Sequence, residues 1–159
     1  MSLKEELDLQ ERIETREHEC ILNIVYTGTM ISKLSYKFFS QFGITDTQFN
    51  ALMRLKYSRE SAQSQSALSK RLIVNKADMT GVIDRLEKAQ LVERVTHPTD
   101  RRVNLIKITK KGVALLAKIE PVYIREINKL TKHLTKAEMQ ENIKSLEQIR
   151  ENVRKKGVI

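Results

Sequence analysis

The chain has 159 residues, of which 40% are hydrophobic and 31% charged, with 5 Gly and 2 Pro. This composition is typical of a folded domain and excludes long linkers, collagen-like repeats and low-complexity structure. The single Cys excludes an internal disulfide and suits a reducing cytoplasm. No apolar run approaches the roughly 18 to 20 residues of a membrane helix, and the acidic N-terminus does not fit a signal peptide.

Positive charge is concentrated in the middle of the chain. Lys and Arg outnumber Asp and Glu by 29 to 20, which gives a net charge of +9. Residues 54–111 hold 14 basic and 6 acidic side chains, whereas residues 1–53 hold 5 and 8. A basic segment of this kind favours a polyanion, most often nucleic acid, as the partner. Charge alone leaves open a basic surface that meets only solvent.

The first third of the chain predicts two helices. Apolar residues three and four positions apart predict a long amphipathic helix from about Leu7 to Phe39. Its stripe consists of Ile21, Ile24, Val25, Gly28, Ile31, Leu34 and Phe38. Gly43 predicts the turn after it. A second helix is predicted to open with a capping box of Thr45 and Gln48 and to fade near Tyr57.

The middle segment predicts two short helices followed by a β-hairpin. Residues 58–66 read as a polar loop, and Ser66 is predicted to cap the first short helix. Asn75 is predicted to cap the second, with Asp78 as its reciprocal partner. The apolar stripe of the second helix consists of Met79, Val82, Ile83 and Leu86. Short strands are predicted over residues 91–96 and 104–109, joined by a basic loop that contains Pro98.

The last third predicts two further helices. Thr109 is predicted to cap the first, and Pro121 is predicted to bend or divide it. A capping box of Thr135 and Glu138 is predicted to open the second, which runs toward the basic residues 154–156. The expected fold is therefore mainly α with a small β-hairpin.

Two short helices and a hairpin in this order form a winged helix-turn-helix, which suits duplex DNA. A helix fits the major groove, where base edges present a distinct hydrogen-bonding pattern. Small and polar residues lie near the start of the second helix, at Asn75, Lys76, Ala77, Thr80 and Gly81. Arg101 and Arg102 in the hairpin loop suit a narrow, electronegative minor groove. The alternative is that these arginines meet only solvent.

The segment from Ser66 to Gly112 resembles the MarR family, the multiple-antibiotic-resistance type of bacterial regulator. Its helix-turn-helix part is carried by residues 67–72, 79–80 and 82–89, where the last run reads Val-Ile-Asp-Arg-Leu-Glu-Lys-Ala. The wing part is carried by residues 91–94, by Asp-Arg-Arg at 100–102, and by residues 108–112. The match is collinear without gaps, and the two Asp-Arg motifs at this separation make it specific.

The resemblance implies a homodimeric transcriptional regulator that binds a palindromic operator in double-stranded DNA. It implies an N-terminal dimerisation helix (1–42), a winged helix-turn-helix lobe (43–112) and C-terminal dimerisation helices (113–159). The terminal apolar stripes agree, because one small lobe could hardly bury them. We expect a repressor, in the bacterial cytoplasm and on the nucleoid when bound, that a small-molecule or oxidant effector releases. No cofactor and no membrane contact are expected.

The resemblance also implies roles for single residues. Lys76, Ala77 and Thr80 correspond to positions that meet base edges and phosphates, and Arg85 to one near the DNA backbone. Asp100 corresponds to a wing residue that holds the neighbouring arginine. The predicted DNA-binding residues are Ser64, Gln65, Ser66, Asn75, Lys76, Ala77, Thr80, Gly81, Arg85, Arg101 and Arg102, with Asp100 supporting the wing.

Four positions depart from the family pattern. Asp78 puts a negative charge near the groove-facing end of its helix, where we expect it to act as a helix cap. Gly81 stands where many relatives carry Arg, so one common DNA contact is missing. Ile73 replaces a frequent Gly in the turn, and Gln90 replaces the usual Gly before the wing strand. We expect these changes to affect the operator sequence more than the fold.

Cys20 is a candidate redox sensor. Oxidant-sensing relatives use a lone Cys in the first helix, about one residue from this position. The alternative is a buried Cys that packs as a small hydrophobe. The acidic residues around His18 (Glu14, Glu17 and Glu19) lack the tight Cys/His spacing of a metal site, so no metal is expected.

Two other functions stay open: a constitutive DNA-binding protein without a ligand, and a winged-helix module for protein–protein contact. An enzyme is not expected. The sequence has no Gly-rich phosphate loop, Ser/His/Asp set or paired-carboxylate arrangement.

Overall fold

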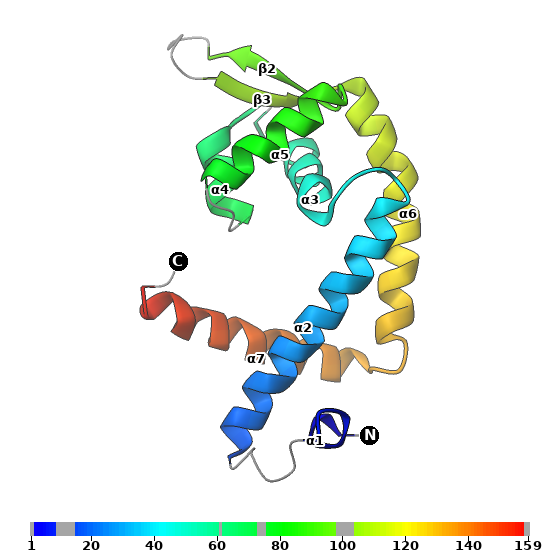
Figure 1. Ribbon diagram of the computed structural model, residues 1–159, viewed down its shortest axis with the longest axis vertical. Coiled ribbons are helices and arrows are strands. Elements are labelled where there is room, and N and C mark those ends of the chain that lie inside the picture. The colour runs from blue at the N-terminus through cyan, green and yellow to red at the C-terminus, as the bar shows by residue number, and fades with distance from the viewer. Residues whose placement is uncertain (1, 9–14, 61, 73–75, 98–103, 158–159) are drawn as a thin grey trace. The chain divides into compact units, whose positions relative to one another are not determined.

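The computed structural model describes residues 2–8, 15–60, 62–72, 76–97 and 104–157 (Figure 1). The chain forms two compact units, residues 1–46 and residues 47–159. Glu14, Ile73, Asn75, Pro98, Asp100, Arg101 and Arg102 lie outside the described residues, as does the side chain of Lys76, so what the sequence predicts for them stays a prediction. None of the described helices is long and apolar enough to cross a membrane.

The first unit contains two helices, α1 (Leu3–Glu6) and α2 (Arg16–Ser40). The prediction of one helix from Leu7 was wrong, because α1 ends before Leu7 and Asp8 adopts a left-handed φ of 52°. The side chain of Thr15 accepts a hydrogen bond from the His18 amide at 3.2 Å and so caps α2.

The end of α2 agrees with the prediction for Gly43. This residue has a φ of 70°, and its amide donates to the Ser40 carbonyl at 3.1 Å. A left-handed conformation suits glycine because no Cβ meets the carbonyl that follows. Phe38 contacts the rings of Phe39 and Phe42, with centroid separations of 5.0 and 5.4 Å.

The second unit contains most of the helices and one sheet. In chain order it holds α3 (Asp46–Lys56), β1 (Gln63–Ser64), α4 (Gln65–Leu72), α5 (Lys76–Lys88), β2 (Val92–Thr96), β3 (Asn104–Ile108), α6 (Lys110–Thr131) and α7 (Lys136–Lys155). Only the first residue of α3 falls in the other unit. The predicted order of helices and hairpin is confirmed.

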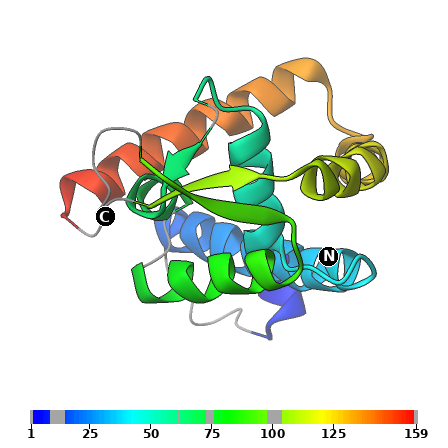
Figure 2. The same cartoon turned by 90° about the horizontal axis from the view of Figure 1, so that it is seen from above.

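The sheet has three antiparallel strands in the order β1-β3-β2 (Figure 2). The predicted hairpin is confirmed as β2 and β3, with Val92 opposite Ile108 and Thr96 opposite Asn104. The third strand was missed, because residues 58–66 read as loop. In it, Gln63 pairs with Ile106. This pairing ties the chain just before α4 to the wing.

The start of α4 corrects a second prediction. Ser66 does not cap this helix, since α4 begins at Gln65 and Ser66 lies within it. The Ser64 hydroxyl instead accepts a hydrogen bond from the Ala67 amide at 3.2 Å. The same residue therefore ends β1 and satisfies one of the free amides at the start of α4.

Both C-terminal helices begin at their predicted caps. Thr109 accepts from the Gly112 amide, and Thr135 and Glu138 form the complete capping box. Pro121 lies inside α6 but does not divide it. Pro121 has no amide N–H to bond the Ala117 carbonyl, and both residues are exposed, so this missing bond lies on the exposed side of α6.

The core of the second unit joins α3, α4, α5, the sheet and the first half of α6. It consists of Phe49, Ala51, Leu52, Leu55, Leu68, Met79, Val82, Ile83, Leu86, Leu91, Val92, Ile106, Leu116 and Ile119. The predicted stripe of α5 is wholly included. The predicted fold class, mainly α with a small antiparallel sheet, is confirmed.

Candidate nucleic-acid interface

Helix α5 has one buried face and one exposed face. Met79, Val82, Ile83 and Leu86 are at most 4% exposed. On the other side Ala77, Thr80 and Arg85 are exposed and Gly81 is partly exposed. The predicted DNA-contacting positions of α5 that the structure describes therefore lie on the free face. A helix held from behind in this way can present its outer face to a groove.

A hydrogen bond links the two helices of the helix-turn-helix at this surface. Gln65 Nε2, in the first turn of α4, donates to Thr80 Oγ1 on α5 at 2.6 Å. Both residues are predicted DNA contacts, and the structure brings them together. The bond restrains the Thr80 side chain and uses one donor of the Gln65 amide, whose oxygen is an acceptor.

Ser64 and Ser66 differ in what they can offer to a phosphate. The Ser64 hydroxyl is already used as the cap of α4 and is partly buried. Ser66 lies in the first turn of α4 and is exposed. The free amides of a helix N-terminus favour anions, so Ser66 and the α4 N-terminus offer the better phosphate position.

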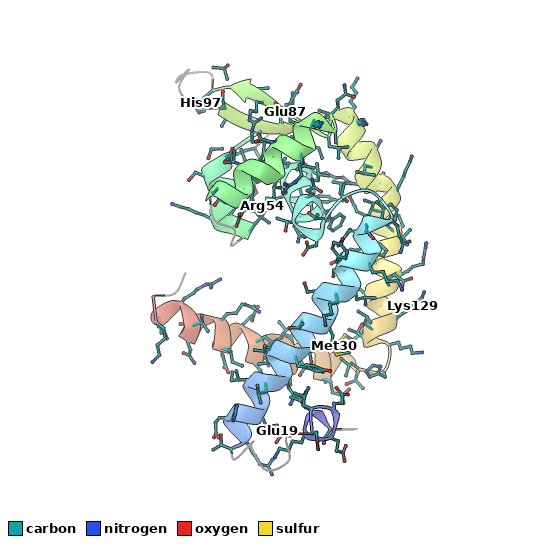
Figure 3. All side chains as sticks on the ribbon, in the orientation of Figure 1. Glu19, Met30, Arg54, Glu87, His97 and Lys129 are labelled. Carbon is teal, nitrogen blue, oxygen red and sulfur yellow. The ribbon has the colours of Figure 1, made fainter. Side chains whose placement is uncertain are left out.

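A pair of ion pairs between α5 and the wing was not predicted. Arg94, on β2, donates hydrogen bonds from its two terminal nitrogens to Asp84 and Glu87, both on α5. Figure 3 labels Glu87 where α5 passes the strands. The bond to Asp84, helped by the charge of Glu87, raises the pKa of the Arg94 guanidinium above its ordinary value.

The Arg94 ion pairs have two consequences for the interface. They hold β2 at a fixed orientation to α5, because a two-nitrogen contact restricts the guanidinium. They also offset one of the two negative charges that Asp84 and Glu87 place on a helix whose outer face is predicted to meet phosphates. The sequence signal was the spacing of Asp84 and Glu87, which places both on one side of α5.

The junction between α5, β2 and α6 is closely packed. A Cβ on Gly112 would lie 2.3 Å from the Leu91 carbonyl oxygen, so this position requires glycine. Thr109 donates to the Gln90 carbonyl at 2.7 Å, and Lys111 donates to the Ala89 carbonyl at 2.9 Å. The first turn of α6 is thus fastened to the end of α5.

Gln90 occupies the glycine-favouring position at the end of α5. Its φ is 59°, and its amide donates to the Glu87 carbonyl at 2.8 Å. The Leu91 amide donates to Leu86 at 2.9 Å, which completes a Schellman-type end. The absence of glycine here therefore changes the side chain and leaves the backbone geometry of the helix end intact.

The sensor candidates lie in the first unit. Cys20 is an exposed free cysteine on α2, so its interpretation as a buried small hydrophobe was wrong for the single chain. Among the described residues no group of three or more His, Cys, Asp or Glu side chains is placed to hold a metal. Glu19 instead forms an ion pair with Lys4 at 3.3 Å.

Comparison with known proteins identifies the family. The family model described as MarR family matches residues 44–103, which contain the helix-turn-helix and most of the wing. The HTH-type transcriptional regulator MhqR of Bacillus subtilis (strain 168) is 33% identical over 98 residues, 62% of this chain and 66% of MhqR. The chain belongs to the MarR family.

Two further comparisons extend over most of this MarR-family chain. The HTH-type transcriptional repressor YetL of Bacillus subtilis (strain 168) is 25% identical over 144 residues, 91% of this chain and 86% of YetL. A crystal structure of a mutant of MarR from E. coli, complexed with operator DNA, matches with a TM-score of 0.74 and 26% identity. That match covers 86% of this chain and 95% of the E. coli chain.

Proposed function

We propose that this protein is a transcriptional regulator that binds double-stranded operator DNA in a sequence-specific manner. The observation that carries the proposal is the free outer face of α5, backed by a complete core and flanked by the β2–β3 wing. The likeness to a MarR chain complexed with operator DNA supports it. The protein acts in the cytoplasm by binding DNA and not as an enzyme.

The proposed DNA-binding residues fall into three groups. Ser64, Gln65 and Ser66 at the start of α4 face phosphates. The outer positions of α5 meet the major groove, and the hairpin loop meets the minor groove, with Asp100 holding an arginine of the loop. The α5 group consists of Asn75, Lys76, Ala77, Thr80, Gly81 and Arg85. The hairpin-loop group consists of Arg101 and Arg102.

The proposed active form is a homodimer. In the single chain, large apolar side chains on α2, α6 and α7 are 38 to 60% exposed. They include Ile21, Val25, Met30, Ile31 and Leu34 on α2, Ile124, Ile127 and Leu130 on α6, and Ile143, Leu146 and Val153 on α7. Burial of apolar area of this extent favours association. A two-fold dimer matches a palindromic operator with half-sites about one helical turn, roughly 34–36 Å, apart.

The proposed output is repression that an effector relieves. A dimer bound across a promoter excludes other proteins from that DNA. A small molecule or an oxidant that favours a different lobe spacing would lower operator affinity, by as much as its preference between the two states. The sequence similarity to a repressor over 91% of this chain supports this direction.

The deciding experiment is the selection of bound duplexes from a random-sequence library at near-physiological salt, followed by sequencing. We expect an enriched inverted repeat with half-sites about one turn apart. The same selection with Arg101→Ala and Arg102→Ala together should lose enrichment while the dimer persists. Arg150→Ala with Arg154→Ala, at the end of α7, is the control with equal charge loss. A soluble dimer that enriches no sequence would reject the proposal.

A further inference from the structure

The guanidinium of Arg85 lies against the backbone of Gly81. The three atoms nearest to a Cβ built on Gly81 are Arg85 Nη1, Nη2 and Cζ, at 3.6, 3.8 and 3.9 Å. The side chain of Arg85 thus runs back along α5 by one turn, in the direction that helical side chains favour. A larger residue at position 81 would occupy the space that the guanidinium now holds.

This contact moves the charge of Arg85 toward the middle of the outer face. At about 100° per residue, the outer face of α5 is centred between Gly81 and Asp84, with Arg85 at one edge. By lying over Gly81, the guanidinium reaches roughly 40° inward from its own Cα. Thr80, held by Gln65, borders the opposite edge. The guanidinium therefore lies where α5 is most open to a groove.

The two arginines of this region differ in their partners. The Arg94 guanidinium is engaged by Asp84 and Glu87. Among the described residues, no hydrogen bond or ion pair engages the Arg85 guanidinium, and its side chain is exposed. All five N–H donors of Arg85 are thus available to a ligand on the outer face.

We propose that Arg85, seated over Gly81, is a specificity-determining residue that reads a guanine in each half-site. A planar guanidinium can donate two parallel hydrogen bonds to O6 and N7 of guanine in the major groove. Position 81 requires a small residue, because a large side chain there would occupy the space of that guanidinium. This inference rests on the proposed operator binding and assigns to Arg85 base recognition in place of a contact to the DNA backbone.

The first test compares Arg85→Ala with Lys88→Ala in the duplex selection described above. Lys88 is an exposed cation of the same helix, so it controls for the loss of one charge. Arg85→Ala should lose the preference for guanine at one position of each half-site and weaken the selected operator about 10- to 100-fold. Its affinity for unrelated duplexes should change no more than that of Lys88→Ala.

The second test changes position 81 and keeps Arg85. Gly81→Leu fills the place of the guanidinium and should lose the same preference as Arg85→Ala. The double variant Gly81→Leu with Arg85→Ala should lose no further preference at that position. Circular dichroism and dimer mass serve as folding controls for all variants.

Two outcomes would overturn the assignment, and both leave operator binding intact. If Arg85→Ala weakens all duplexes equally and lowers the salt slope by about one, Arg85 contacts a phosphate. If Arg85→Ala selects the unchanged inverted repeat with unchanged affinity, Arg85 faces solvent. Failure of the wild-type protein to enrich any duplex is a separate result, which rejects the proposed function itself.

Discussion

Helices α5 and α7 use apolar residues in opposite ways. Helix α5 has 13 residues and buries its whole apolar stripe at 4% exposure or less. Helix α7 has 20 residues and buries none, although Ile143, Leu146 and Val153 repeat along it. Most of α2 is like α7, with Met30 exposed near its middle (Figure 3). The winged lobe therefore completes its core within one chain, whereas the terminal helices leave apolar faces exposed.

The largest effect is expected from a charge placed on the exposed apolar face of a terminal helix. Ile31→Asp on α2 would place a charge in the proposed apolar dimer interface, so the dimer dissociation constant should rise roughly a thousandfold, about 4 kcal/mol. Sedimentation at micromolar concentration should show monomers with unchanged helix content. Ser32→Asp adds the same charge at the next, polar position and is the control. A dimer that survives Ile31→Asp would place the interface elsewhere.

The second prediction concerns a substitution that should destabilise the winged lobe without changing the apolar faces of the terminal helices. Gly112→Ala brings a Cβ to 2.3 Å from the Leu91 carbonyl oxygen and 2.8 Å from Ile108 Cγ1. Because backbone must shift, we expect a loss of about 3 kcal/mol in the free energy of unfolding, measured in urea. Gly81→Ala, whose nearest contact is at 3.6 Å, should be neutral or stabilising. Equal stability of both variants would contradict the close packing.

The third prediction concerns the link between α5 and the wing. Arg94→Leu leaves Asp84 and Glu87 without their shared cation, so operator affinity should fall about tenfold. Stability should fall by only about 1 kcal/mol, because these side chains are partly exposed. Arg125→Leu, at an exposed position of α6, is the control in a fluorescence-anisotropy titration. Unchanged affinity of Arg94→Leu would remove this link from the recognition surface.

The smallest effect is a pH dependence of the lobe. Burial alone would raise the pKa of Glu120, but hydrogen bonds from Lys56 and Tyr57, both at 2.6 Å, hold the pKa below its ordinary value. Its contribution to stability is therefore present above the ordinary pKa of about 4.5 and is lost as pH falls through the lowered folded pKa. We expect the free energy of unfolding, measured in urea between roughly pH 3 and 7, to increase less with pH in Glu120→Gln than in the wild-type protein.

The sequence predicted the elements that local side chains specify. The caps at Thr109 and Thr135, the glycine turn at Gly43 and the apolar stripe of α5 each depend on residues within one or two turns. Those predictions are confirmed. The fold class followed from the order of such elements.

The features that the sequence missed depend on contacts between distant segments. Strand β1 has only two residues, too few for a period of two, and exists because Gln63 pairs with Ile106. The cap of α4 is Ser64, the last residue of this strand, and not Ser66. The Arg94 ion pairs and the position of the Arg85 guanidinium also depend on tertiary structure, so composition and spacing could not reveal them.

Helix α6 gives the lobe a mechanical property. It runs unbroken through Pro121 for 22 residues, a length of about 33 Å, and its first turn is fastened to Ala89, Gln90 and Leu91. A lobe attached so firmly must follow its helix as a rigid body. A tilt of about 10° over that length displaces the attached end by roughly 6 Å. Helix α6 thus acts as a lever arm: a small change in its angle produces a displacement of the winged lobe that is too large for α5 to stay in the same groove.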